Sequence, residues 1–236
     1  MVETSPRLKA RIAGILYLIG PCGFAEGVRN RLTVDGDPAA TAASILSHEP
    51  LFRWALVGDL AGIACYIVVL LLLYDLVRLV NRNVALLAVF FSLMAHTIQA
   101  VILVFHYAPL FLLKSEHVLG AFKLDQLQAL AYTSLELHDV GYNIDLAFFG
   151  FYCLAMGYLL FRSTYFPRIL GVLMAFAGLS YLTNSTLSLV APTLADQLMP
   201  YILIPALGEL VLALWLLLRG INMVQWNKFH ASLLDA

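Results

Sequence analysis

The chain has 236 residues, of which 61% are hydrophobic and 12% charged, and its formal net charge is -1. Soluble domains are about 45–50% apolar and about 25% charged, so a globule of this composition would lack the polar surface to cover itself, and lipid must cover part of it. The near-neutral charge also argues against a nucleic-acid partner, which normally requires a basic face.

Six stretches are apolar and long enough, or nearly so, to cross a bilayer, because a membrane helix needs about 20 mostly apolar residues. They are Arg11–Val28, Trp54–Val77, Val84–Leu113, Asp139–Phe161, Ile169–Val190 and Leu198–Leu218. The sequence therefore predicts an all-α fold: a polytopic membrane helix bundle with six transmembrane helices, forming a single integral membrane domain over residues 1–236.

The first of these stretches has some features of a signal peptide. Basic residues precede a short apolar run, and Gly23-Phe24-Ala25 resembles a cleavage site. A lipoprotein box at Cys22 is disfavoured by Pro21, which occupies the position where that signal needs a small residue. We interpret the segment as a true first span that bends at Pro21.

The basic residues predict the orientation, because cytoplasmic loops of membrane proteins carry an excess of Lys and Arg. With the N-terminus inside, nine basic residues are cytoplasmic and five are external, so both termini are expected in the cytoplasm. The inner set is Arg7, Lys9, Arg11, Arg78, Arg82, Arg162, Arg168, Arg219 and Lys228, and the outer set is Arg29, Arg31, Arg53, Lys114 and Lys123. Aromatic residues near the span ends fit a membrane-interface belt: Trp54, Tyr107, Tyr165 and Tyr201.

Both long outer loops are expected to contain a short interfacial helix. Asp37-Pro38 followed by AATAASIL has an N-cap residue and a proline in the first turn. In the second loop, apolar residues recur at roughly helical spacing from Leu124 to Leu135.

Polar side chains interrupt the predicted spans, where an ionisable group costs at least a few kcal/mol and therefore normally faces the bundle interior. In the third span, His96, Gln99 and His106 fall within one angular sector at about 100° per residue. Asp59 enters the outer part of the second span, and Glu26 closes the first.

The remaining spans continue this pattern. His138, Tyr142 and Asp145 are spaced i, i+4, i+7, which is one face of the fourth span. Asn184 belongs to a polar stripe in the fifth, and Glu209 lies near the middle of the sixth. We infer an acidic polar pocket that opens outward, with ten candidate ligand-binding residues: Glu26, Asp59, His96, Gln99, His106, His138, Tyr142, Asp145, Asn184 and Glu209.

Several stretches resemble a bacterial membrane-protein family known as domain of unknown function 4386. They are RIAGILYLIG from Arg11, DPAATAASIL from Asp37, FRWALVGDL from Phe52, LVNRNVALLAVFF from Leu79, the long stretch from Leu137 to Ser185 and GELVLALWLLLRG from Gly208. The segment from His138 to Gly171 is the most specific, because HxxGY, FFG, GYLLFRS and PRILG occur in it in order. The resemblance implies a multi-pass membrane fold and no particular activity.

Three classes of function remain open. The first is the binding or transport of a small polar or cationic ligand, or of protons, with Asp145 and Glu209 as charge partners. The second is a membrane-embedded metal-dependent hydrolase acting on a lipid-linked substrate, for which the candidate metal ligands are Glu26, Asp59, His106 and His138. The third is a structural or partner-binding subunit. No catalytic residue or cofactor is assigned, and whether the protein is an enzyme is left open.

The expected partners are the lipid bilayer, a small polar ligand and a second copy of the chain, because a transporter with only six spans is expected to dimerise. The expected location is the bacterial cytoplasmic membrane. The three cysteines, Cys22, Cys65 and Cys153, have neither a disulfide pattern nor metal-ligand spacing, and we interpret them as small buried hydrophobic residues.

Overall fold

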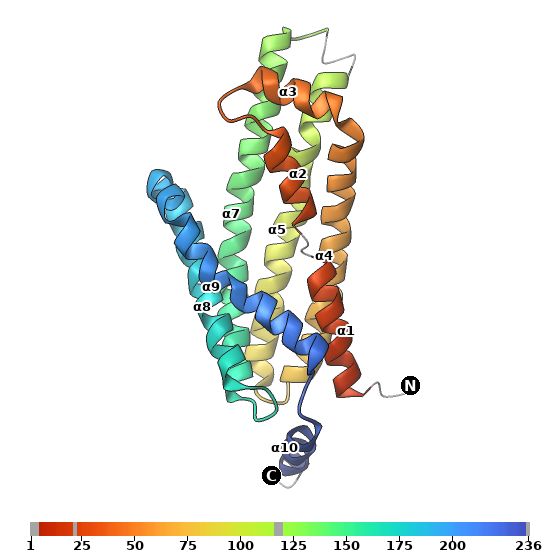
Figure 1. Cartoon of the computed structure of the whole chain (residues 1–236), viewed down its shortest axis with the longest axis vertical. Helices are drawn as coiled ribbons and strands as arrows, with labels where there is room; N and C mark the ends of the chain where they lie inside the picture. Colours follow the sequence, from red (N-terminus) through yellow and green to blue (C-terminus); the bar gives the residue numbers. More distant parts are fainter. Residues whose placement is uncertain (1–4, 21–22, 116–119, 235–236) are drawn as a thin grey trace. The chain divides into compact units, whose positions relative to one another are not determined.

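The structure is a computed structural model that describes residues 5–20, 23–115 and 120–234, and every regular element within these ranges is an α-helix (Figure 1). The helices are α1 (Pro6–Ile19), α2 (Phe24–Leu32), α3 (Pro38–Ser47), α4 (Glu49–Val77), α5 (Arg82–Lys114), α7 (Leu124–Arg162), α8 (Arg168–Val190), α9 (Pro192–Leu218) and α10 (Met223–Leu234). This confirms the predicted all-α fold.

Five segments are long and apolar enough to cross a membrane. They are Pro6–Leu32, Glu49–Val77, Arg82–Lys114, Leu124–Arg162 and Arg168–Val190. A sixth is obtained if the pair Ile204–Leu218 and Met223–Ser232, bent by 94°, counts as one span. The protein is therefore a polytopic helix bundle with five or six candidate spans.

The first predicted span is not one continuous helix in the structure. α1 ends at Ile19, and α2 begins only at Phe24. Gly23, the N-cap of α2, has φ 65°, a left-handed conformation that interrupts helical geometry. Pro21 and Cys22, where the bend and the lipoprotein box were considered, lie outside the described residues.

One of the two predicted loop helices forms as expected, and the other does not. Asp37 caps α3, because its Oδ1 accepts a hydrogen bond from the Ala40 amide at 2.9 Å, and Pro38 is the first helical residue. The segment from Leu124 to Leu135 is not a separate helix: it is the first part of α7, which has 39 residues. Its apolar spacing was correct, but no helix-breaking residue separates it from the fourth span.

The chain divides into two compact units, which we describe separately. Unit 1 consists of Met1–Ile19, Cys65–His96 and Asn143–Ala236, and unit 2 of Gly20–Ala64 and Thr97–Tyr142. The boundaries fall within α4, α5 and α7, so each of these helices contributes residues to both units.

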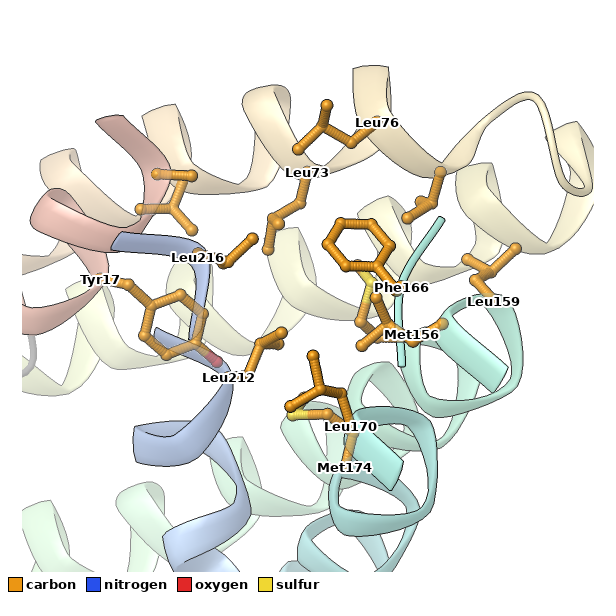
Figure 2. Close-up of a cluster of buried hydrophobic side chains, with 14 of the residues drawn as sticks. Tyr17, Leu73, Leu76, Met156, Leu159, Phe166, Leu170, Met174, Leu212 and Leu216 are labelled. Carbon is orange, nitrogen blue, oxygen red and sulfur yellow. The ribbon is translucent and has the colours of Figure 1, made fainter. Parts of the chain in front are cut away.

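Unit 1 has an apolar core to which α4, α7, α8 and α9 contribute. Figure 2 shows Leu73, Met156, Leu170 and Leu212 from these four helices converging on one cluster, with the ring of Tyr17 at its side. These residues are almost completely buried. Tyr165, between α7 and α8, is 2% exposed and donates to the Leu76 carbonyl at 2.6 Å, so it does not belong to an interfacial belt as predicted. Burial raises the pKa of its hydroxyl.

Glycines let α7 and α8 approach closely in unit 1. A Cβ atom on Gly171 would lie 2.6 Å from the Gly157 carbonyl oxygen, and one on Gly178 would lie 2.7 Å from that of Gly150. Both helices therefore carry a pair of glycines seven residues apart, and each pair meets the other. Small residues at such contacts are typical of membrane helix pairs, because they allow backbones to touch.

Unit 2 is built from α2, α3 and the adjoining parts of α4, α5 and α7. Its main apolar cluster includes Val28, Leu32, Ile45, Phe52 and Leu110. These residues hold α2 and α3 against the longer helices and thereby position the polar side chains of α2.

Candidate functional site

The ten predicted residues divide between the two units. His96, Asp145, Asn184 and Glu209 belong to unit 1, and Glu26, Asp59, Gln99, His106, His138 and Tyr142 belong to unit 2. A surface groove of about 360 Å³ is lined by Glu49, Pro50, Arg53, Trp54 and Val57, and thus by none of the ten.

In unit 1, Glu209 of α9 is surrounded by uncharged polar side chains from other helices. The Cys153 thiol of α7 donates to Glu209 Oε1 at 3.1 Å, and Cys153 is completely buried. The hydroxyl groups of Tyr17 and Tyr181 also lie close to this carboxyl. Within the described ranges, Glu209 takes part in no ion pair with Lys, Arg or His.

The polar side chains around Glu209 adjoin an aromatic cluster. The Tyr66 hydroxyl donates to the Tyr17 hydroxyl at 3.0 Å. The Tyr66 ring stacks on His96 with centroids 4.3 Å apart, and Phe149 contacts both rings edge-on. We call Tyr17, Tyr66, His96, Cys153, Tyr181 and Glu209 the glutamate cluster; its side chains come from α1, α4, α5, α7, α8 and α9.

His96 has one nitrogen fixed by its own helix. Its Nδ1 lies 2.8 Å from the Ser92 carbonyl oxygen. Because a carbonyl only accepts hydrogen bonds, Nδ1 carries a proton. In the neutral ring, Nε2 is then an acceptor.

Asp145 is 6% exposed and, among the residues described, has no hydrogen bond or ion pair. Asn184 of α8 donates from Nδ2 to Asn143 Oδ1 at 3.2 Å, while its own Oδ1 is buried without a partner in the described part of the chain. Buried polar groups normally have partners, so the Asn184 Oδ1 atom is unusual.

In unit 2, three of the four predicted metal ligands surround Arg29 instead. Arg29 Nη1 donates to Asp59 Oδ2 at 2.6 Å and to His106 Nδ1 at 2.9 Å, and Nη2 donates to Glu26 Oε2 at 2.8 Å. Arg29 is 7% exposed. We call Glu26, Arg29, Asp59 and His106 the arginine cluster.

Both nitrogens of His106 are already engaged. Arginine has no acceptor, so Nδ1 accepts from Arg29, and Nε2 donates to the Phe52 carbonyl oxygen at 3.1 Å. The ring therefore offers no lone pair to a metal. His138 lies beside it, with ring centroids 6.2 Å apart. In the ranges that the structure describes, no three His, Cys, Asp or Glu side chains are placed to hold a metal ion.

Tyr142 and Gln99, like Asp145, Asn184 and His138, belong to neither cluster. Tyr142 is 37% exposed, whereas His138 and Asp145 on the same predicted face are buried. The spacing i, i+4 placed Tyr142 near the edge of that face, where Gly141 packs against Ile102 instead. Gln99 is half-buried.

Sequence reasoning missed Arg29, Tyr17, Tyr66, Cys153 and Tyr181. Arg29 was assigned to an outer segment, although its i, i+3 spacing from Glu26 was a signal for pairing. The tyrosines and Cys153 are apolar enough to have been treated as core, and no local signal marks their contacts with Glu209.

A helix bundle with five or six candidate spans and buried polar clusters defines a multi-pass membrane protein. The chain matches the profile of the family described as domain of unknown function (DUF4386) over residues 12–220, and it belongs to this family. The predicted resemblance is thereby confirmed. An uncharacterized protein of Archaeoglobus fulgidus is 26% identical over 176 residues, which cover 75% of this chain and 89% of that protein. No solved structure matches the chain.

Proposed function

We propose that this membrane protein binds and relays protons, with Glu209 as the central proton-exchanging group. The observation that carries the proposal is the environment of Glu209: the Cys153 thiol donates to it, the Tyr17 and Tyr181 hydroxyls lie close to it, and no cation pairs with it in the described part of the chain. A partly buried negative charge without a cation beside it is unfavourable in a membrane-spanning helix. A proton or a small cation supplies the missing positive charge.

A proton suits this site better than a larger ligand. Groups around Glu209 already lie within hydrogen-bond distance of a neighbour. The Cys153 thiol is 3.1 Å from Glu209 Oε1, and the Tyr66 and Tyr17 hydroxyls are 3.0 Å apart. A proton moves along such a chain by exchanging donors and acceptors, and it needs no additional space. Tyr66, Tyr17 and Glu209 form the relay, and His96, stacked on Tyr66, is the nearest imidazole in the cluster.

The metal-dependent hydrolase has less support. Arg29 occupies the centre of Glu26, Asp59 and His106, and a guanidinium excludes a metal ion from the same position by charge and by volume. A location in the bacterial cytoplasmic membrane and a homodimer belong to the proposal, on the basis of the basic-residue distribution and the small number of spans.

Proton flux into proteoliposomes tests the proposal. Purified protein is reconstituted with an internal pH-sensitive dye, and a potassium diffusion potential drives proton entry. We expect Glu209→Gln to abolish the protein-dependent flux, because the amide exchanges no proton, and Glu136→Gln, on the exposed part of α7, to leave it unchanged. Full flux in Glu209→Gln, or no flux above empty vesicles for the wild type, would overturn the proposal.

A further inference from the structure

The guanidinium of Arg29 has one edge that its neighbours do not satisfy. An arginine side chain presents five N–H groups in a planar fork, and the Nε–H and one Nη2–H point the same way along one edge. At Arg29, Nη1 is fully engaged by Asp59 and His106. Nη2 is bound by Glu26, but Nε is buried with no hydrogen-bond partner among the described residues.

The partners of Arg29 differ in how firmly they are held. The Asp59 side chain is 14% exposed and His106 is completely buried, so these two hold the guanidinium in place. The Glu26 side chain is 46% exposed and contacts only one end of the open edge. A buried N–H without a partner is unfavourable. Because Glu26 leaves the Nε–H unpaired, it satisfies the edge incompletely.

We propose that the Nε–Nη2 edge of Arg29 is a binding site for an oxyanion, either a carboxylate or a phosphate, and that Glu26 occupies it in the absence of the ligand. An oxyanion with two oxygens would accept from Nε and Nη2 together, as bidentate arginine pairs do. Glu26 would turn out into solvent, which its exposure allows. The exchange replaces one negative charge by another, so the charge balance with Arg29 and Asp59 is unchanged.

This site is distinct from the glutamate cluster, and all of its residues belong to unit 2. The water-soluble and lipid forms of the ligand share the same chemistry: a small acid such as acetate or phosphate, or the head of a fatty acid. The experiment below distinguishes these two sources.

The test observes the Nε–H of Arg29 by NMR in the full-length protein in detergent micelles. The signal is assigned by its loss in Arg29→Lys, a variant that keeps the charge and removes the fork. Acetate, phosphate and laurate are titrated separately, with dodecanol as the uncharged control for laurate. A response to laurate alone assigns a lipid carboxylate, and a response to acetate or phosphate assigns a soluble anion; either supports the site.

Variants without the competing Glu26 carboxylate provide a second test of the site. We expect Glu26→Ala to lower the half-saturating anion concentration about tenfold or more, because a charge-assisted hydrogen bond no longer has to be displaced. Glu26→Gln, which keeps the side-chain shape, should act in the same direction and serves if the alanine variant does not fold. An Arg29 Nε–H signal that no anion shifts, in the wild type and in both Glu26 variants, would overturn the proposal.

Discussion

The Tyr66 hydroxyl donates a hydrogen bond to the Tyr17 hydroxyl at 3.0 Å, and both side chains are buried. Tyr17 thus accepts from Tyr66, and its hydroxyl also lies close to the Glu209 carboxyl. Removing the Tyr17 hydroxyl leaves the Tyr66 hydroxyl without its acceptor and takes a polar neighbour from Glu209, whereas removing the Tyr66 hydroxyl takes away only a donor.

We therefore expect Tyr17→Phe to lower the free energy of unfolding by about 1–3 kcal/mol, and Tyr66→Phe to lower it by less. Unfolding in detergent micelles by added SDS measures the difference. Equal losses in the two variants would show that Tyr17 does not link Tyr66 to Glu209.

The glycine contacts between α7 and α8 predict a position-dependent loss of stability. In Gly171→Ala the new Cβ would lie 2.5 Å from the Phe161 amide nitrogen, so the backbones must separate. We expect a loss of about 1–3 kcal/mol in the free energy of unfolding. Gly27→Ala in α2 is the matched control, because nothing lies within 4 Å of its Cβ position. It should be neutral or stabilise by up to about 1 kcal/mol; similar losses in both variants would contradict the packing argument.

We expect that replacing Asp145 by an apolar residue stabilises the protein. Its carboxyl is buried and has no partner among the described residues, so its removal relieves an uncompensated polar group. Asp145→Leu should raise the free energy of unfolding by about 1–3 kcal/mol. The same SDS titration measures this, and a marked loss of stability would reveal a binding partner that Asp145 needs in the folded protein.

The topology predicts where the two ends of the chain lie. Lys9 of α1 pairs with Asp75 near the end of α4 at 2.7 Å, as expected if the start of α1 and the end of α4 are both at the cytoplasmic surface. With six spans, both termini are cytoplasmic. A C-terminal fluorescent-protein fusion should be bright and an alkaline phosphatase fusion inactive; the opposite pair of results would indicate five spans.

The amino-acid sequence by itself determined the membrane class and most of the helices. Apolar content and span length are properties of local stretches, so α4, α5 and α8 could be predicted to within about five residues at each end. The Asp37 cap could be predicted for the same reason, because its hydrogen bond reaches only three residues along the chain. The helix boundary at residues 20–23 was harder, since a glycine in a left-handed conformation is not visible in hydropathy.

Only the tertiary structure decided which polar residues meet. Arg29 bonds to Asp59 and His106, which are 30 and 77 residues away, and Cys153 bonds to Glu209 over 56 residues. Helical periodicity indicates which face of a helix a side chain occupies, but it does not indicate which neighbouring helix that face contacts or at what height. That register depends on packing between helices, and in unit 2 it places Arg29, not a metal ion, among Glu26, Asp59 and His106.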